Sequence, residues 1–184
     1  MKSILNYINE SMSKISQNTF AGWLINNFDL KLAEEVLKKD MSRVRRLNSG
    51  QFDFLAHYEE DADIYIMYKQ IDRKNSKMTF SSNELDNGML KITDKPAINT
   101  YIAYFLDNKL NLVEISNIER LINDKNEVDL KNIEFDDKID MTQEQVAKYN
   151  EVYEIYDNIS PNDKNFNKNF KQLPQFEEIR DLIK

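Results

Sequence analysis

The first hydrophobic pattern along the chain has helical spacing. Apolar residues recur every three or four positions and so fall on one side of a helix. That side is formed by Leu5, Ile8, Met12 and Ile15. The pattern predicts a short amphipathic helix within residues 1–17. Because such a helix is barely stable alone in water, its apolar side must pack either on this chain or on a partner. We treat it as a candidate partner-binding surface.

A second helical pattern covers residues 30–47. Its apolar positions again recur every three or four residues, while acidic residues come early and basic residues come late, which suits the helix dipole. Asp29 directly precedes the first apolar position, so we expect its carboxylate to cap the start of this helix. The sequence Asn48-Ser49-Gly50 marks the predicted end.

Basic residues gather near the end of this predicted helix. Arg43, Arg45 and Arg46 follow two lysines and form the strongest positive cluster in the sequence. Two interpretations remain open. The arginines are either solvated side chains that match the negative end of the helix dipole, or contacts for a phosphate group or an acidic partner.

The hydrophobic period changes to two in the middle of the chain, which is typical of β-strands. The links between the apolar segments are short and rich in turn residues, so we expect mostly antiparallel neighbours. The predicted strands cover residues 52–56, 64–71, 77–80, 89–92, 100–106 and 110–115. A short helix follows at once, with Ser116 as its expected N-cap.

Residues 123–140 lack the hydrophobic periodicity of the preceding segments. This pattern predicts an irregular surface segment or a short hairpin at the sheet edge. Helical spacing then returns, where Thr142 and Gln145 have the spacing of a capping box. A final short helix is predicted from residue 175 to the end of the sequence.

The order of these elements predicts an α+β fold with N-terminal helices, a central, mostly antiparallel sheet of about five or six strands, and C-terminal helices. We divide the chain into an amphipathic helix over residues 1–17, a single domain over residues 18–160, and a C-terminal extension over residues 161–184. No segment has the roughly 20 apolar residues of a membrane span.

Composition narrows the function classes. The chain has no cysteine, which excludes disulfides, thiol catalysis and cysteine-ligated metals and fits a reducing cytoplasm. The net charge of −7 opposes broad attraction to nucleic acid and favours protein partners or bound cations. The single histidine, His57, cannot form a site with several histidine ligands within one chain.

One stretch carries candidate metal chemistry. Residues 51–74 read as two strands joined by an acidic turn, with Asp53 early in the first strand and Asp72 and Lys74 late in the second. In a twisted hairpin these three side chains would converge at one end. Two interpretations remain open: a metal-binding hairpin, or a sheet edge with charged residues that face water.

The spacing of Asp53 from Asp72-Arg73-Lys74 resembles the PD-(D/E)XK nuclease superfamily, in a degenerate form and over about residues 30–122. The resemblance implies that Asp53 and Asp72 would bind Mg²⁺ and that Lys74 would orient or stabilise the attacking hydroxide. Mg²⁺ suits such chemistry because it activates water and offsets the charge that develops on phosphate. The sequence departs from the superfamily pattern in lacking a proline before Asp53.

The first ten residues, MKSILNYINE, resemble the head-targeting peptides of internal proteins of tailed bacteriophages. In those families a phage protease cuts after the final glutamate, here Glu10. The resemblance implies a phage protein that acts in the cytoplasm of a bacterial host or in the virion.

Two function classes follow. The first is a non-catalytic interaction protein of phage or mobile-element origin, which needs no cofactor and acts within or on a protein assembly through a protein partner or as a homo-oligomer. The second is a Mg²⁺-dependent nuclease, active or degenerate, whose partner would be nucleic acid. Neither class requires a membrane.

Overall fold

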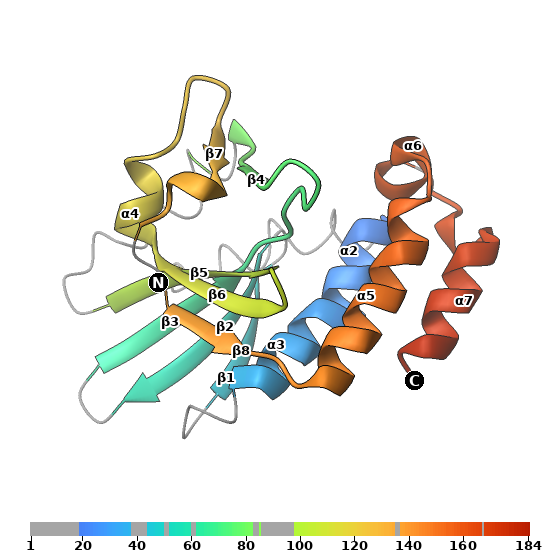
Figure 1. Cartoon of the computed structure of the whole chain (residues 1–184), viewed down its shortest axis with the longest axis horizontal. Helices are drawn as coiled ribbons and strands as arrows, with labels where there is room; N and C mark the ends of the chain where they lie inside the picture. The colour runs from blue at the N-terminus through green and yellow to red at the C-terminus, as the bar shows by residue number, and fades with distance from the viewer. Residues whose placement is uncertain are drawn as a thin grey trace, which may run out of the picture. The chain divides into compact units, whose positions relative to one another are not determined.

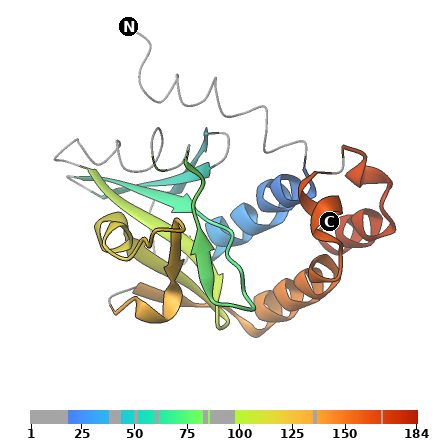
Figure 2. The same cartoon turned by 90° about the horizontal axis from the view of Figure 1, so that it is seen from above.

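The fold is α+β, with helices at both ends of the described chain and β-sheets between them (Figures 1 and 2). This computed structural model describes residues 19–37, 44–49, 52–59, 62–82, 85, 98–134, 137–166 and 168–184. The predicted fold class is confirmed. Contacts group the chain into two compact units, and we describe each by itself. The first unit comprises Met1–Leu32, Asn48–Gln51 and Met141–Lys184, and the second comprises Ala33–Leu47 and Phe52–Asp140.

The first helical segment runs without a break through three elements. They are α2 (Phe20–Leu24), the π-helical η2 (Ile25–Asp29) and α3 (Leu30–Leu37). Thr19 begins the segment, since its hydroxyl accepts a hydrogen bond of 3.0 Å from the Gly22 amide. The π-helical turn has a local cause: the side-chain amides of Asn26 and Asn27 donate to the carbonyls of Gly22 and Trp23, at 2.8 and 2.7 Å.

Two predictions about this segment are wrong. Asp29 is not a helix cap, because it lies inside the continuous helical segment and is fully buried. The helix predicted over residues 30–47 is also too long, since Val44–Ser49 forms the strand β1, next to β2 in the sheet. Helical spacing and a matched dipole are local signals, and pairing with a neighbouring strand outweighed them. The basic residues of β1 are typical of an edge strand.

The C-terminal helices agree more closely with the predictions. They are α5 (Gln143–Asp157), α6 (Pro161–Asn165), the 3₁₀ turn η6 (Phe170–Gln172) and α7 (Pro174–Leu182). The predicted capping box at the start of α5 is confirmed: the Gln145 amide donates to the Thr142 hydroxyl at 3.2 Å, and the Thr142 amide donates to Gln145 Oε1 at 2.9 Å. The predicted final helix is α7.

Aromatic rings form the core of the first unit. Phe20 stacks on Phe170 with ring centroids 5.6 Å apart, and Tyr156 meets Phe20 edge-on, also at 5.6 Å. Phe176 packs on Trp23 at 4.7 Å. These contacts join α2 to α5, η6 and α7 in one aromatic core.

The second unit is built on a mixed sheet in the order β1-β2-β3-β5-β6-β8. Its further strands are β2 (Phe52–Glu59), β3 (Ala62–Tyr68), β5 (Ile98–Leu106), β6 (Lys109–Glu114) and β8 (Asp137–Asp140). Antiparallel pairs join β2 to β3, β5 to β6 and β6 to β8, as expected. The β3–β5 pair is parallel, which the short-link argument did not predict, because the chain leaves this sheet between the two strands.

The centre of this sheet carries the apolar core and one buried amide. Ile66, Ile102 and Val113 are fully buried. The β5–β6 turn places Asp107 and Asn108 at φ 52° and 63°, which suits a two-residue hairpin loop. Asn111 of β6 is buried, and its amide nitrogen lies 3.2 Å from the Leu106 carbonyl oxygen, to which it donates.

A small second sheet pairs two strands that are distant in sequence. It consists of β4 (Lys77–Thr79) and β7 (Glu127–Asp129), seen side by side in Figure 2. The 3₁₀ turn η5 (Leu130–Asn132) follows β7. Residues 123–140 are therefore not one hairpin, because β7 pairs with β4 whereas β8 pairs with β6 at the sheet edge.

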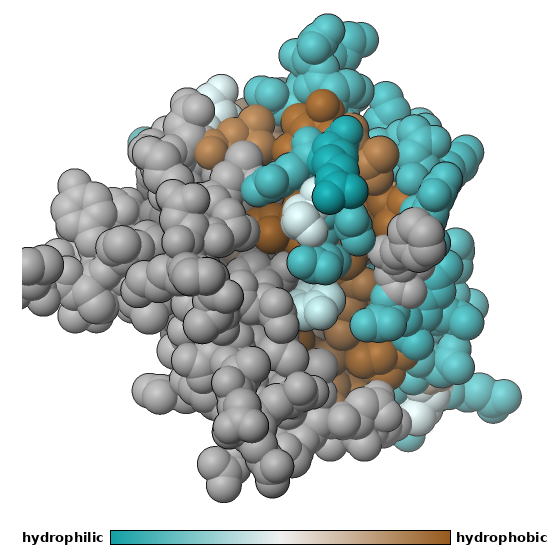
Figure 3. Space-filling model, turned by 90° about the vertical axis from the view of Figure 1, so that its left-hand side faces the viewer, coloured by the Kyte–Doolittle hydropathy of each residue, from teal (hydrophilic) through white to brown (hydrophobic). Residues whose placement is uncertain are grey.

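Helix α4 (Ile115–Glu119) follows β6 directly. Its N-cap residue is Glu114 rather than Ser116, so the predicted cap is wrong. The reason is packing: the helix starts two residues earlier than predicted, which buries both Ile115 and Ile118. In the face shown in Figure 3, hydrophobic residues reach the surface between hydrophilic ones.

The helix predicted within residues 1–17 and the strand predicted over residues 89–92 lie outside the described ranges. Of the predicted helix end at Asn48-Ser49-Gly50, Asn48 and Ser49 instead lie in β1, and Gly50 is outside the described ranges. The predicted division of the chain at residues 17 and 160 stays a prediction. Within the described part of the chain, no helix is both long and apolar enough to cross a membrane.

Candidate functional site

The hairpin that carries the candidate metal residues is present. β2 and β3 pair antiparallel from Phe54 opposite Met67 to Glu59 opposite Ala62, so residues 60 and 61 link the two strands. Asp53 lies in β2, one residue before the paired Phe54. The first of the three predicted site residues is thus on the expected strand.

Asp72 and Lys74 lie elsewhere than predicted. The strand that was expected to contain them ends at Tyr68. Asp72 instead opens a tight turn that closes at Lys77: the Asp72 amide donates to the Lys77 carbonyl at 2.8 Å, and the Lys77 amide donates back at 3.2 Å. The alternation that placed Asp72 and Lys74 on one side of β3 is therefore wrong. An aspartate that organises its own turn competes with continued strand pairing.

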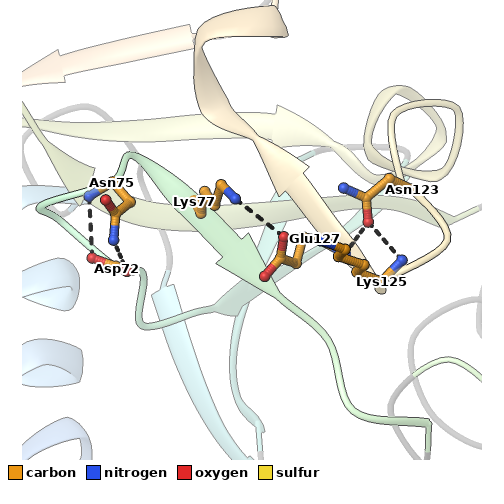
Figure 4. Close-up of polar contacts among 6 residues, drawn as sticks. All are labelled: Asp72, Asn75, Lys77, Asn123, Lys125 and Glu127. Carbon is orange, nitrogen blue, oxygen red and sulfur yellow. Dashed lines mark hydrogen bonds and ion pairs between the residues drawn. The ribbon is translucent and has the colours of Figure 1, made fainter.

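The Asp72 carboxylate serves this turn (Figure 4). Oδ1 accepts hydrogen bonds from the amides of Lys74 and Asn75 at 3.0 and 3.2 Å, and Oδ2 accepts one from the Asn75 side chain at 2.7 Å. The Asn75 side-chain bond is the main reason why the pKa of Asp72 lies below its ordinary value of 3.8. Both carboxylate oxygens thus already stabilise the loop that Lys74 belongs to.

A charged pair links the two strands of the neighbouring small sheet. Lys77 Nζ lies 3.2 Å from Glu127 Oε2, between β4 and β7 (Figure 4). The turn before β7 is fixed in a similar way to that at Asp72, because Asn123 Oδ1 accepts bonds from the amides of Lys125 and Glu127 at 2.9 and 3.0 Å. These polar groups have a structural role in the two turns and the sheet.

The metal-binding roles of Asp53 and Asp72 and the catalytic role of Lys74 stay predictions. Among the residues that the structure describes, no group of three or more acidic or histidine side chains is placed to hold a metal ion. Arg45 and Arg46 lie in β1, while Arg43 is outside the described ranges. The same is true of the predicted partner-binding residues Leu5, Ile8, Met12 and Ile15.

An exposed aromatic residue is the feature that sequence patterns missed. Phe166 follows α6, and 77% of its surface is accessible to solvent. Among the described residues, Phe166 is the only large hydrophobic residue that is exposed. Its sequence signal was an aromatic residue within an Asn- and Lys-rich segment, which we interpreted only as a break in regular structure.

The backbone around Phe166 is anchored on both sides. The Phe166 amide donates to the Asn162 carbonyl at 2.8 Å. Before it, the Lys164 ammonium lies 4.5 Å from the centre of the Tyr156 ring. After it, Phe170 is buried in the aromatic core of the first unit. The segment therefore presents Phe166 from a supported backbone rather than from a free terminus.

The first unit also contains a buried polar pair. The Tyr153 hydroxyl donates to Asp29 Oδ2 at 2.6 Å, and both residues are buried. Asp29 reaches this position because the π-helical turn brings two neighbouring residues, Phe28 and Asp29, into the interior. π-Helical turns often occur at functional sites, and here the turn positions a buried carboxyl group.

We compared the chain with family models, with curated proteins and with solved structures, and found no match in any of the three.

Proposed function

We propose that this chain is a non-catalytic interaction protein that acts within or on a protein assembly, and that Phe166 is an anchor for its partner. The observation that carries this proposal is the 77% exposure of Phe166. Exposing a large aromatic side chain forgoes about 1.5–3 kcal/mol of burial, which a partner can recover by supplying a pocket.

The surroundings of Phe166 support an anchor role. Exposed polar residues lie near it in sequence, among them Asn165 and Lys168. An apolar centre with a polar rim is the usual composition of a protein–protein contact. The backbone hydrogen bond at Phe166 and the anchored residues on either side lower the entropy that would be lost on binding.

The kind of assembly rests on the N-terminal resemblance. Residues 1–10 resemble a phage head-targeting peptide, and the stripe from Leu5 to Ile15 has the spacing of a docking helix. We therefore propose a phage or mobile-element protein of the bacterial cytoplasm or the virion. Phe166 and the N-terminal stripe would then be two separate contacts.

Site-specific photo-crosslinking tests the Phe166 contact. A photoreactive phenylalanine analogue is placed at position 166, and a matched control carries it at Glu178, an exposed position of α7 in the same unit. Both proteins are irradiated in bacterial cells that produce them. We expect one discrete crosslinked product from position 166 and none from position 178.

A competition experiment separates specific from accidental contact. Excess unmodified chain should abolish the product at position 166, whereas excess Phe166→Ser chain should not, because it lacks the anchor. Asn165→Ser, an exposed change in the same segment, should compete as well as the unmodified chain. Equal competition by Phe166→Ser, or no product at position 166, would contradict the proposal.

A further inference from the structure

The second unit contains a hollow of about 290 Å³ that none of the candidate sites above uses. Its lining comes from two segments, the end of α4 and the end of η5. The residues are Asn117, Arg120, Leu121, Asn132, Ile133 and Glu134. Ligand pockets for drug-sized molecules usually measure about 300–1,000 Å³, so this hollow suits a smaller molecule.

Both walls of the hollow are held in place by the core. Ile118 of α4 is fully buried, and the Leu121 amide donates to the Ile118 carbonyl at 2.9 Å. On the other side Leu130 is buried, and its amide donates to the Ser76 carbonyl at 2.9 Å. The hollow is thus formed before any ligand binds, which lowers the entropy cost of binding.

The charged groups of the lining, Arg120 and Glu134, are of opposite sign. Among the described residues, neither Arg120 nor Glu134 has an ion pair or a hydrogen bond made by its side chain. Both are exposed, although they line the same hollow. A guanidinium favours a carboxylate, and a carboxylate favours an ammonium group.

The rest of the lining completes the chemistry. Leu121 and Ile133 are half-buried and supply an apolar surface. Asn117 and Asn132 add amide donors and acceptors. A phosphate-like anion would meet repulsion from Glu134, and a simple cation would meet repulsion from Arg120. A small zwitterion with an apolar part matches the positive, the negative and the apolar parts of the lining.

We propose that this hollow binds a free α-amino acid with an apolar side chain. The carboxylate of the ligand would pair with Arg120, its ammonium group with Glu134, and its side chain would lie on Leu121 and Ile133. The proposal does not depend on the Phe166 contact, so either one can fail alone.

An NMR titration of the full chain with L-leucine tests the site. We expect saturable shifts of the Asn117, Leu121 and Ile133 amides. Arg120→Gln and Glu134→Gln should each weaken binding about tenfold, the size expected for losing one hydrogen bond to a charged group.

Matched controls carry the same kind of change next to the site. Glu119→Gln and Lys131→Gln alter exposed charges that neighbour the lining but do not belong to it. Binding by these two variants should stay within about twofold of the unchanged chain, as for surface substitutions generally. Equal weakening in controls and site variants would overturn the proposal.

Blocked ligands test the zwitterion directly. N-acetyl-leucine lacks the ammonium charge and leucine amide lacks the carboxylate. Weaker binding of both forms than of leucine supports the assignment. Equal binding of either form, or shifts with leucine that rise without saturating, would show that the paired charges of the hollow do not select this ligand and would overturn it.

Discussion

The hydroxyl of Tyr153 donates a hydrogen bond of 2.6 Å to Oδ2 of Asp29, across 124 positions of sequence. It joins the middle of α5 to the π-helical turn η2, inside the first unit. A buried carboxyl group is costly unless hydrogen bonds replace its contacts with water. The position of Asp29 in the core therefore depends on Tyr153.

We expect Tyr153→Phe to lower the free energy of unfolding by about 1–3 kcal/mol, because it removes the hydroxyl and leaves the aromatic ring in place. Urea denaturation of the full chain measures the loss. The control is a double-mutant cycle with Asp29→Leu, which removes the acceptor. If Tyr153→Phe costs as much in the Asp29→Leu background as in the unchanged chain, the two side chains are not coupled and the interpretation fails.

Asn75→Ala should raise the pKa of Asp72 toward its ordinary value of 3.8, because the Asn75 side chain is the main cause of the lowered pKa. The lowered value means that ionised Asp72 favours the folded state. This contribution is present above about pH 3.8 and is lost as the pH falls through the folded pKa. NMR detection of the Asp72 carboxyl carbon across acidic pH measures the shift. Asn123→Ala, a similar change in the other turn, should leave the titration of Asp72 as it was.

A Mg²⁺ titration distinguishes the turn from a metal-binding hairpin. Since Asn75 and the backbone already donate to both Asp72 oxygens, we expect no saturable shift of the Asp72, Lys74 and Asn75 amides. Saturable shifts at Asp53 and Asp72 that disappear in Asp72→Ala would contradict this expectation. They would favour the Mg²⁺-dependent nuclease and would justify assays on DNA and RNA.

Asn111→Leu should destabilise the second unit by about 1–3 kcal/mol, although it replaces a polar residue by a hydrophobic one of similar size. The amide of Asn111 donates to backbone carbonyls of the β5–β6 hairpin, at 3.2 Å for Leu106 and for Lys109. Thermal denaturation measures the loss. Asn132→Leu, an exposed change in the same unit, should have almost no effect. Equal transition temperatures for the two variants would mean that the buried amide is dispensable.

Sequence patterns predicted the elements best where the signal is local. The capping box of Thr142 and Gln145 and the helix that it begins were both found, because the motif needs only neighbouring residues and side chains three positions apart. The alternation in residues 100–106 and 110–115 likewise predicted β5 and β6. The predictions were wrong where a distant partner competed with a local preference.

The candidate sites show the same difference between features set by neighbouring residues and features set by distant ones. Asp53 was placed on the correct strand, because strand alternation is a local property. Asp72 was not, since a turn closed by Asn75 and Lys77 replaced the end of the strand. Phe166, Arg120 and Glu134 had no sequence signal for function, because exposure and the shape of a hollow depend on which segments meet in space.

The sequence by itself determined the α+β class, the order of most elements and the acidic, cysteine-free character of the chain, since these follow from periodicity and composition. Only the tertiary structure decided that β3 and β5 run parallel, that β4 pairs with β7, and that Asp29 turns inward to Tyr153. Each of these joins residues far apart along the chain. The free energy that stabilises these contacts comes from burial and strand pairing between segments that are distant in sequence.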